Sequence, residues 1–367
     1  MRPDVGDASH ALERARESLR ELSLYSTDRA PAEVPLADNT NAWGMPPAAA
    51  RALAAAGAAG SSYPSPYGEA LKEALAGRLA VPVDALVTGC GSDDVLFSAM
   101  RAFGAPGARI AFTVPTFSMV PVFARVNGLE PVPVPPGAGL VPDADALLAT
   151  GAEIVYLCSP NNPTGTVVPP DTLRRVLERA AGLVIVDEAY VEFAGESLAT
   201  RAPSLGNVLV ARTLSKAFGL AGLRVGYGVG APALVEAVEK ARGPYKVNAL
   251  GERAAVAALT EGGAWVEEHV ALAVEARERL AERLRGLGLA PLPSAANFLL
   301  VPVPAAPGAV ELARRMRVQG VAVRPFAALP VVGDALRISV GPWPLVERAV
   351  AALARAMRGA AGDVEGA

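Results

Sequence analysis

The segment 208–227 reads Val208-Leu209-Val210-Ala211-Arg212-Thr213-Leu214-Ser215-Lys216-Ala217-Phe218-Gly219-Leu220-Ala221-Gly222-Leu223-Arg224-Val225-Gly226-Tyr227, a short apolar strand followed by a glycine-rich loop. Lysine is rare in this 367-residue chain, which contains only Lys72, Lys216, Lys240 and Lys246. A lysine in an apolar loop suggests a need for an amine that can lose its proton, which an arginine cannot meet. A desolvated lysine of this kind forms Schiff bases with carbonyl groups. On its own, Lys216 could also be an ordinary lysine of a surface loop.

The same segment carries groups that bind phosphate. The hydroxyls of Thr213 and Ser215 and the guanidinium of Arg224 could hold such an anion. A second segment, Gly89-Cys90-Gly91-Ser92-Asp93, leads from a strand into a helix, where the first backbone N–H groups form an anion site. A plain glycine turn with Ser92 as the helix N-cap is the alternative interpretation of that segment.

Two further strands end in unusual residues. The strand Ile154–Leu157 is followed by Ser159-Pro160-Asn161-Asn162-Pro163-Thr164-Gly165, and Leu183–Val186 is followed by Asp187-Glu188-Ala189-Tyr190. Ligands of open α/β sheets bind beyond the carboxyl ends of the strands. A carboxylate at 187 could keep a pyridine nitrogen protonated, although a helix cap or a metal ligand are alternatives.

Three other side chains could complete such a site. Asn162 and Tyr190 could hold a phenolic oxygen of a flat cofactor, and Phe117 could stack on its ring or lie in the core. No histidine lies near Asp187 in the sequence, so we predict no metal site.

The order of predicted elements indicates an α/β fold with a mainly parallel sheet covered by helices on both faces. Strands are predicted at Leu86–Thr88, Arg109–Phe112, Ile154–Leu157, Leu183–Val186 and Val208–Ala211, and helices at Ala11–Leu22, Glu69–Leu79, Asp93–Phe103 and Asp171–Ala181, the last with Gly182 as its C-cap. After Gly251 the predicted elements are helices Glu252–Leu259 and Trp265–Leu287 and strands Asn297–Val301, Val321–Arg324 and Leu336–Val340. We therefore predict a large domain at residues 38–258, a smaller α+β domain at 259–367, and an N-terminal arm, residues 1–37, that belongs to the small domain.

The composition excludes several classes of protein. Hydrophobic residues make up 51% of the chain and charged residues 19%, enough apolar material for a sizeable core. With 34 basic against 37 acidic residues, nothing favours nucleic-acid binding. Two cysteines and two histidines exclude a disulfide framework and a zinc cluster of these residues. The longest uncharged run, between Arg285 and Glu311, contains five prolines, so we expect no membrane helix. The first residues carry acids and no apolar segment, so we expect no secretory signal and a cytoplasmic protein.

Seven blocks together resemble the fold-type I pyridoxal-phosphate aminotransferases, specifically the histidinol-phosphate aminotransferase group. They are Tyr63-Pro64, Gly91-Ser92-Asp93-Asp94, Pro115-Thr116-Phe117, the segment 159–165, Val186-Asp187-Glu188-Ala189-Tyr190, the segment 215–227, and Leu336-Arg337-Ile338-Ser339-Val340-Gly341. They occur in the family's order and cover nearly the whole chain. The block at 159–165 together with the lysine block is highly specific for the fold and less specific for the substrate.

The resemblance implies a role for each matched residue. Lys216 would hold pyridoxal 5'-phosphate covalently, Asp187 would pair with its ring nitrogen, Asn162 and Tyr190 would hold its phenolic oxygen, and Phe117 would stack on its ring. The phosphate would be held by the backbone at Ser92 and Asp93 with Thr213, Ser215 and Arg224. Tyr63 would reach the phosphate from a second subunit, which implies a homodimer.

The substrate side is predicted from the same resemblance. Arg337 would bind a carboxylate, with an exposed strand arginine as the alternative. Arg324, in the extended run Val321-Ala322-Val323-Arg324-Pro325, would bind a distal phosphate, so that two arginines grip two anionic ends of one ligand; a solvated strand arginine is the alternative. Tyr25 could add a hydroxyl, and Asn41 would border the substrate side chain. The family's Asn-Glu-Asn-Pro is replaced here by Asn39-Thr40-Asn41-Ala42, and Lys246 replaces a more familiar Asn or His.

The predicted function is transfer of an amino group from histidinol phosphate to 2-oxoglutarate, with Lys216, Asp187 and Tyr190 as the catalytic residues. An aromatic or broad-range aminotransferase and a threonine-phosphate decarboxylase are the alternatives within the fold. A non-catalytic cofactor-binding regulator is not favoured, because Lys216, Asp187 and Arg337 are all intact. A nicotinamide oxidoreductase is not favoured, because the glycine run 226–230 does not continue into the required pattern before a helix.

Overall fold

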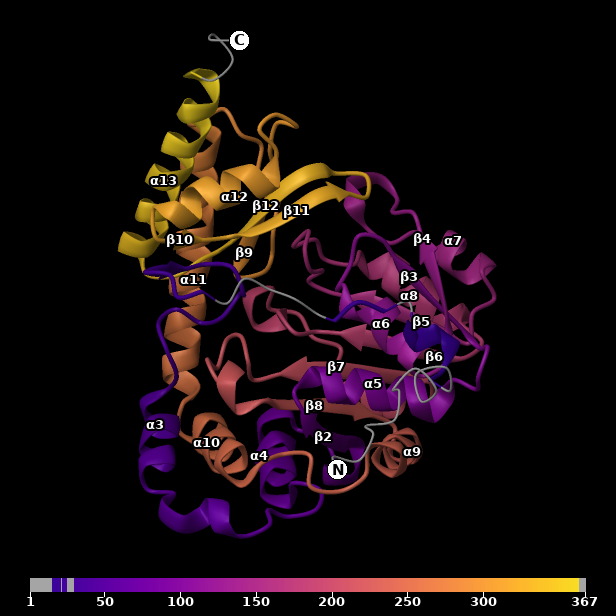
Figure 1. The fold of residues 1–367 in the computed structure, drawn as a ribbon. Coiled ribbons are helices and arrows are strands. Elements are labelled where there is room, and N and C mark those ends of the chain that lie inside the picture. Colours follow the sequence, from indigo (N-terminus) through magenta and orange to yellow (C-terminus); the bar gives the residue numbers. More distant parts are fainter. Residues whose placement is uncertain (1–14, 21, 25–29, 363–367) are drawn as a thin grey trace, which may run out of the picture.

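A computed structural model describes residues 15–20, 22–24 and 30–362 of the chain (Figure 1). Its centre is a seven-stranded sheet in which β8 runs antiparallel to both of its neighbours and the other pairings are parallel. The strand order is β2 (Leu86–Cys90), β8 (Val225–Gly230), β7 (Val208–Thr213), β6 (Leu183–Asp187), β5 (Ile154–Cys158), β3 (Arg109–Thr113) and β4 (Glu130–Val134). The predicted α/β class and mainly parallel sheet are therefore confirmed.

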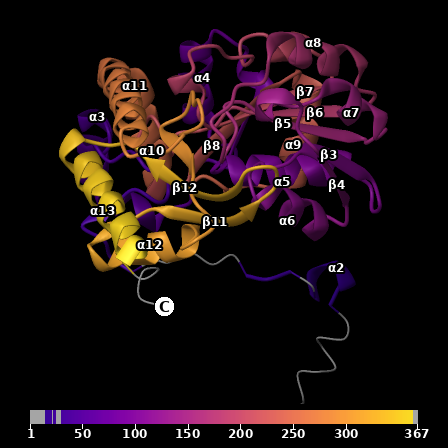
Figure 2. The same ribbon diagram turned by 90° about the horizontal axis from the view of Figure 1, so that it is seen from above.

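Helices cover both faces of this sheet (Figure 2). On one face lie α5 (Ser92–Phe103), α6 (Met119–Val126) and α9 (Pro232–Arg242). On the other lie α4 (Glu69–Leu79), α7 (Ala144–Ala149), α8 (Pro170–Arg179) and α10 (Ala249–Thr260), with α3 (Pro47–Ala54) packed against α10. Short 3-10 turns connect these elements at Gly57–Ser61, Val83–Ala85, Ala138–Leu140, Val191–Phe193, Ala202–Ser204 and Ala221–Leu223.

Alternation along the central strands determines which side chains reach each face. In β6, Val184 and Val186 enter the core beneath α8, while Leu183 and Ile185 enter the core beneath α5. Asp187 is the next residue in the phase of Leu183 and Ile185, at the carboxyl end of the strand. The strand therefore places a carboxylate at the edge of a fully apolar layer, where water is excluded.

A second, smaller sheet is antiparallel, with the order β11 (Arg324–Leu329), β12 (Gly333–Ser339) and β9 (Phe298–Pro302). The helices α11 (Gly263–Arg285), α12 (Ala309–Val318) and α13 (Trp343–Gly362) pack around it (Figure 1). The short strand β1 (Val34–Pro35) pairs with β10 (Val321–Ala322), so the chain before residue 38 contacts this sheet's end of the molecule. The domain boundaries at 37 and 258 remain predictions.

Several predicted boundaries differ from the structure. The helix predicted at Asp171–Ala181 is α8, which begins at Pro170 and ends at Arg179, so Gly182 is not its C-cap. Gly182 is needed for another reason, since a Cβ there would lie 2.0 Å from the carbonyl oxygen of Glu153. The predicted strand Val321–Arg324 is divided at Val323, with β10 before it and β11 beginning at Arg324. The strands β4 and β8 were not predicted.

Of the N-terminal helix predicted at Ala11–Leu22, the structure has only α2 (Glu17–Arg20), since residues 15, 16 and 22 are not helical and the others lie outside the described residues. Arg16 donates a hydrogen bond to the carbonyl oxygen of Val126. Within the described ranges, no helix is both long enough and apolar enough to span a bilayer.

Candidate active site

Asp187 is a buried carboxylate with both oxygens hydrogen-bonded. The Tyr156 hydroxyl donates to its Oδ2 at 2.7 Å, and the backbone N–H of Ala189 donates to its Oδ1 at 3.0 Å. Burial raises the pKa of Asp187 to about 6, and the two hydrogen bonds oppose that rise. A neighbouring cationic group would therefore be strongly favoured at this position, because it would compensate the buried charge.

Lys216 follows β7 and lies partly buried in the same region. Its Nζ donates to the carbonyl oxygen of Asp38 at 3.2 Å and lies 5.7 Å from the centroid of the Tyr190 ring. Burial, followed by the positive charge of Arg337, lowers the pKa of Lys216 to about 8. A useful fraction of this amine is thus unprotonated near neutral pH, which the surface-lysine interpretation does not explain.

An anion cradle forms where α5 begins. Gly91 is its N-cap and Ser92 its first residue, so the first backbone N–H groups of a twelve-residue helix open here. Thr213 donates to the Ser215 hydroxyl at 2.9 Å, and Arg224 donates to it at 3.4 Å. These groups combine hydrogen-bond donors and positive charge, as a phosphate requires.

Two glycines keep the cradle open, and an acid holds its arginine. Gly91 has φ +79°, and a Cβ at this position would lie 2.3 Å from Nη2 of Arg224. A Cβ at Gly226 would lie 2.2 Å from the backbone nitrogen of Ser92. Arg224 also forms an ion pair with Asp93, whose carboxylate lies 3.2 Å away. The Asp93 side chain therefore orients the guanidinium, while the Asp93 backbone lines the cradle.

Two further polar side chains, Arg337 and Tyr190, have hydrogen-bond partners in other segments of the chain. Arg337 is 8% exposed and donates to Oδ1 of Asn162 at 2.6 Å and to the carbonyl oxygen of Ala37 at 2.7 Å. Tyr190 is buried, and its hydroxyl accepts from Asn39 at 3.0 Å. Burial raises the pKa of Tyr190 to about 12, with the charge of Arg337 opposing the shift. Arg337 is therefore not an exposed strand arginine.

Arg324 and Arg337 are directly opposite each other in the antiparallel pair of β11 and β12. Opposite residues of such a pair point to the same face, and like charges there repel each other. The register therefore brings the two arginines together on the hairpin of β11 and β12, while their contact with one ligand remains a prediction. An anion near both guanidinium groups would relieve the repulsion.

Residues 32–353 match the family model described as aminotransferase class I and II. The chain belongs to this family of aminotransferases. It is 35% identical over 362 residues to a histidinol-phosphate aminotransferase of Desulfitobacterium hafniense, covering 96% of this chain and 99% of the relative. It is 38% identical to a histidinol-phosphate aminotransferase of Stenotrophomonas maltophilia, over 96% of this chain and 98% of that protein. Among solved structures, the histidinol-phosphate aminotransferase of Sinorhizobium meliloti in complex with pyridoxal-5'-phosphate superposes with a TM-score of 0.86 at 27% identity, covering 94% of this chain and 98% of that one.

The structure describes two of the three remaining predicted site residues of this aminotransferase, Phe117 and Tyr63. Phe117 is half-buried and packs edge-on against Phe123, with 6.4 Å between the ring centroids. Tyr63 is 86% exposed and its ring lies 5.1 Å from that of Tyr245. Tyr25 lies outside the described residues. Within those residues, no group of three or more His, Cys, Asp or Glu side chains could hold a metal ion.

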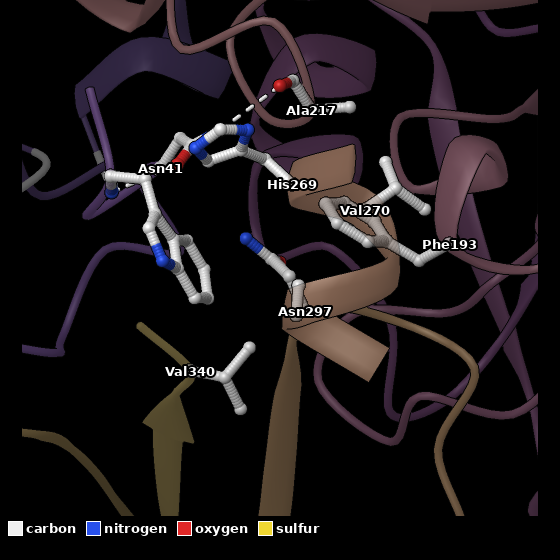
Figure 3. Close-up of a pocket in the computed structure, with 9 residues that line it drawn as sticks. Asn41, Phe193, Ala217, His269, Val270, Asn297 and Val340 are labelled. Carbon is white, nitrogen blue, oxygen red and sulfur yellow. Dashed lines mark hydrogen bonds between the residues drawn. The ribbon is translucent and has the colours of Figure 1, made fainter. Parts of the chain in front are cut away.

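Asn41 of the aminotransferase holds the lysine loop. Its Nδ2 donates to the carbonyl oxygen of Ala217 at 3.0 Å, and its Oδ1 accepts from the backbone of Trp43 at 3.0 Å. This side chain lines a cavity of about 10 Å³, roughly the space of one water molecule. His269 and Asn297 also lie in its wall (Figure 3). Its predicted contact with a substrate remains a prediction, while its contact with the residue next to Lys216 was not predicted.

Sequence reasoning missed three polar residues of the aminotransferase site. Tyr156 bonds to Asp187, Asn39 bonds to Tyr190, and the Ser339 hydroxyl donates to Oδ1 of Asn39 at 2.9 Å. A tyrosine within the apolar run of β5 was a usable signal, because a buried hydroxyl needs a partner. Nothing local connects Asn39 to Ser339, which lies 300 residues away.

Proposed function

We propose that this aminotransferase uses pyridoxal 5'-phosphate to transfer the amino group of histidinol phosphate to 2-oxoglutarate. The observation that carries the proposal is the placement of three groups at the carboxyl ends of β2, β6 and β7, which run in the same direction in one sheet, so that these ends lie at one edge of it. These are the Lys216 amine, the buried Asp187 carboxylate and the anion cradle at the start of α5. The relatives named above support the substrate, and the neighbouring structure with pyridoxal-5'-phosphate supports the cofactor.

The residues present fit this cofactor. Glycines at 91 and 226 leave the cradle free of side chains that would fill it. There the phosphate would be held by the backbone N–H groups of Ser92 and Asp93, the hydroxyls of Thr213 and Ser215, and Arg224. Phe117 would stack on the ring, Asn162 and Tyr190 would hold its phenolic oxygen, and Asp187 would face its nitrogen.

When bound, pyridoxal phosphate links covalently to an amine and withdraws electrons from the substrate Cα through a ring whose nitrogen is protonated. Asp187 holds that proton in place by its negative charge. The Nζ of Lys216 would accept the proton from the substrate Cα as general base and would then give it up as general acid. A pKa near 8 suits both tasks near neutral pH. The Tyr190 hydroxyl would donate a hydrogen bond to the phenolic oxygen of the cofactor.

The two arginines would serve the two substrates in turn. Histidinol phosphate carries a phosphate and no carboxylate, so the expected grip on two anionic ends of one ligand does not apply to it. Its phosphate would lie between Arg324 and Arg337, which the strand register places opposite each other. Glutamate would use Arg337 for its α-carboxylate. The predicted contacts of Tyr25 and Asn41 with the substrate remain part of this proposal.

A substrate panel tests the function. The purified protein, with 2-oxoglutarate as acceptor, should convert histidinol phosphate faster than phenylalanine, tyrosine or threonine phosphate. Preference for phenylalanine or tyrosine would favour the aromatic aminotransferase, and release of carbon dioxide from threonine phosphate would favour the decarboxylase. No turnover of any donor would contradict the whole proposal.

Arg324→Ala should reduce the specificity constant for histidinol phosphate while leaving the half-reaction with glutamate less affected. Losing a charge-assisted contact costs roughly 1.5–3 kcal/mol, or about ten- to a hundredfold in kcat/KM. Single-turnover measurements with each donor check the difference. Arg174→Ala, in an exposed ion pair within α8, is the matched control and should change neither half-reaction. Equal losses for both donors would make Arg324 a structural residue.

The proposal includes a homodimer in which Tyr63 completes the neighbouring subunit's site. The exposed rings of Tyr63 and Tyr245 support it, since large exposed apolar groups often mark interfaces. A cytoplasmic location is also part of the proposal, and fractionation of the native host would test it.

Tyr63→Phe should weaken cofactor binding about tenfold, because one hydrogen bond to a charged phosphate is lost. At a cofactor concentration too low to load Tyr63→Phe, mixing this variant with the inactive Lys216→Ala should raise the activity, because each mixed dimer keeps one site with both residues intact. Cofactor titration and activity after subunit exchange are the measurements. An active monomer in sedimentation, or no recovery after mixing, would refute the shared site.

A further inference from the structure

Tyr156 is a buried tyrosine in the middle of an apolar strand. It is 1% exposed, and β5 and β6 are paired in parallel so that Cys158 is opposite Asp187. Tyr156 and Cys158 share one face of the sheet, as alternate residues of a strand do. The tyrosine ring therefore lies in the same layer as Asp187, and its hydroxyl reaches Oδ2 at 2.7 Å.

This hydrogen bond differs from one that only satisfies a buried hydroxyl. Oδ1 of Asp187 already accepts from the backbone of Ala189, so Tyr156 supplies the donor for the other oxygen. Burial raises the pKa of Tyr156 well above its usual value, so the phenol keeps its proton and donates it. Among the influences that oppose the raised pKa of Asp187, this hydrogen bond is the largest.

We infer that Tyr156 is a positioning residue for Asp187, which keeps the carboxylate ionised and fixes the direction of its free lone pairs. The inference rests on the role of Asp187 in the proposed function. Tyr156 does not need to touch the cofactor or the substrate. It acts only through the carboxylate, and because both side chains are almost fully buried, the low local dielectric strengthens the hydrogen bond between them.

Tyr156→Phe removes the hydroxyl and leaves the ring. The pKa of Asp187 should then rise above about 6, because burial is opposed by one hydrogen bond fewer. Selective ¹³C labelling of aspartate, with Asp187→Asn to assign the signal, measures this in the full chain without cofactor. The affinity for pyridoxal phosphate near pH 7 should fall several-fold, and kcat should fall about tenfold with little change in KM.

The matched control is Tyr227→Phe. Tyr227 is also a buried tyrosine of the central sheet, but it lies beside Arg212, with the guanidinium 5.7 Å from its ring centroid. Removing the Tyr227 hydroxyl should leave the pKa of Asp187 unchanged. If Tyr156→Phe also leaves the titration unchanged, Tyr156 only fills space and the inference is wrong.

A second variant covers the case in which Tyr156→Phe does not fold. Replacing Tyr156 by 3-fluorotyrosine makes the phenol a stronger donor, so the pKa of Asp187 should fall, and an unchanged or raised value would overturn the inference. The titration needs no substrate. Failure of every amino donor would therefore refute the proposed aminotransferase activity without affecting this result.

Discussion

Lys216→Arg should abolish turnover, with a loss of at least about 10³-fold. General acid–base catalysis alone contributes roughly 10²–10⁴-fold, and the covalent attachment of the cofactor is lost as well. A guanidinium neither attaches to a carbonyl in this way nor gives up its proton near neutral pH. Steady-state kinetics measure the loss, and borohydride reduction followed by peptide mapping should place the cofactor label on Lys216 of the wild type.

The pH dependence of this reaction follows from the surroundings of Lys216. Since its pKa is lowered to about 8, the amine is mostly protonated below pH 8 and mostly free above it. The rate at which the cofactor-free protein takes up pyridoxal phosphate should rise with pH and level off above about pH 8. Lys240→Arg, which changes an exposed lysine paired with Glu236, is the control and should keep full activity. A label on any lysine other than Lys216 would contradict the assignment.

Asp187→Asn should leave a folded protein whose transamination is reduced by about 10²–10³-fold, which is typical of removing one preorganised electrostatic group. The amide oxygen of Asn can accept from the backbone N–H of Ala189, and its NH2 can donate to the Tyr156 hydroxyl, so both buried groups keep a partner and the fold is maintained. The amide carries no charge, so it cannot keep a pyridine nitrogen protonated. Kinetics at saturating cofactor measure the loss, and thermal unfolding checks the fold.

Asp171→Asn, in an exposed ion pair with Arg174, is the control for a carboxylate that does no chemistry. It should have wild-type kinetics. If Asp187→Asn turned over nearly as fast as the wild type at saturating cofactor, the pairing with a ring nitrogen would be wrong, and the buried carboxylate would have to be explained by folding alone.

Local pattern was sufficient for most of the elements. Short apolar runs predicted the central parallel strands β3, β5, β6 and β7, and the helical period predicted α4 and α5. The errors lie where another part of the chain intervenes. Gly182 looked like a helix C-cap, but its lack of a side chain is required by the carbonyl of Glu153. The strand β8 escaped prediction because its glycines weaken the apolar signal and serve close packing instead, as at Gly226.

The amino-acid sequence by itself determined the family, and it predicted the lysine, the aspartate and the anion-binding segments of the candidate site. Each of these is made of short segments that can be recognised one by one along the chain, and the family follows from the order of seven such segments. Tertiary structure alone decided the contacts of Tyr156 with Asp187 and of Asn39 with Ser339. It also decided the pKa values, because burial and the charge of Arg337 act on Lys216 across more than a hundred residues of chain. Strand register and desolvation depend on how distant segments pack, and no local pattern contains that information.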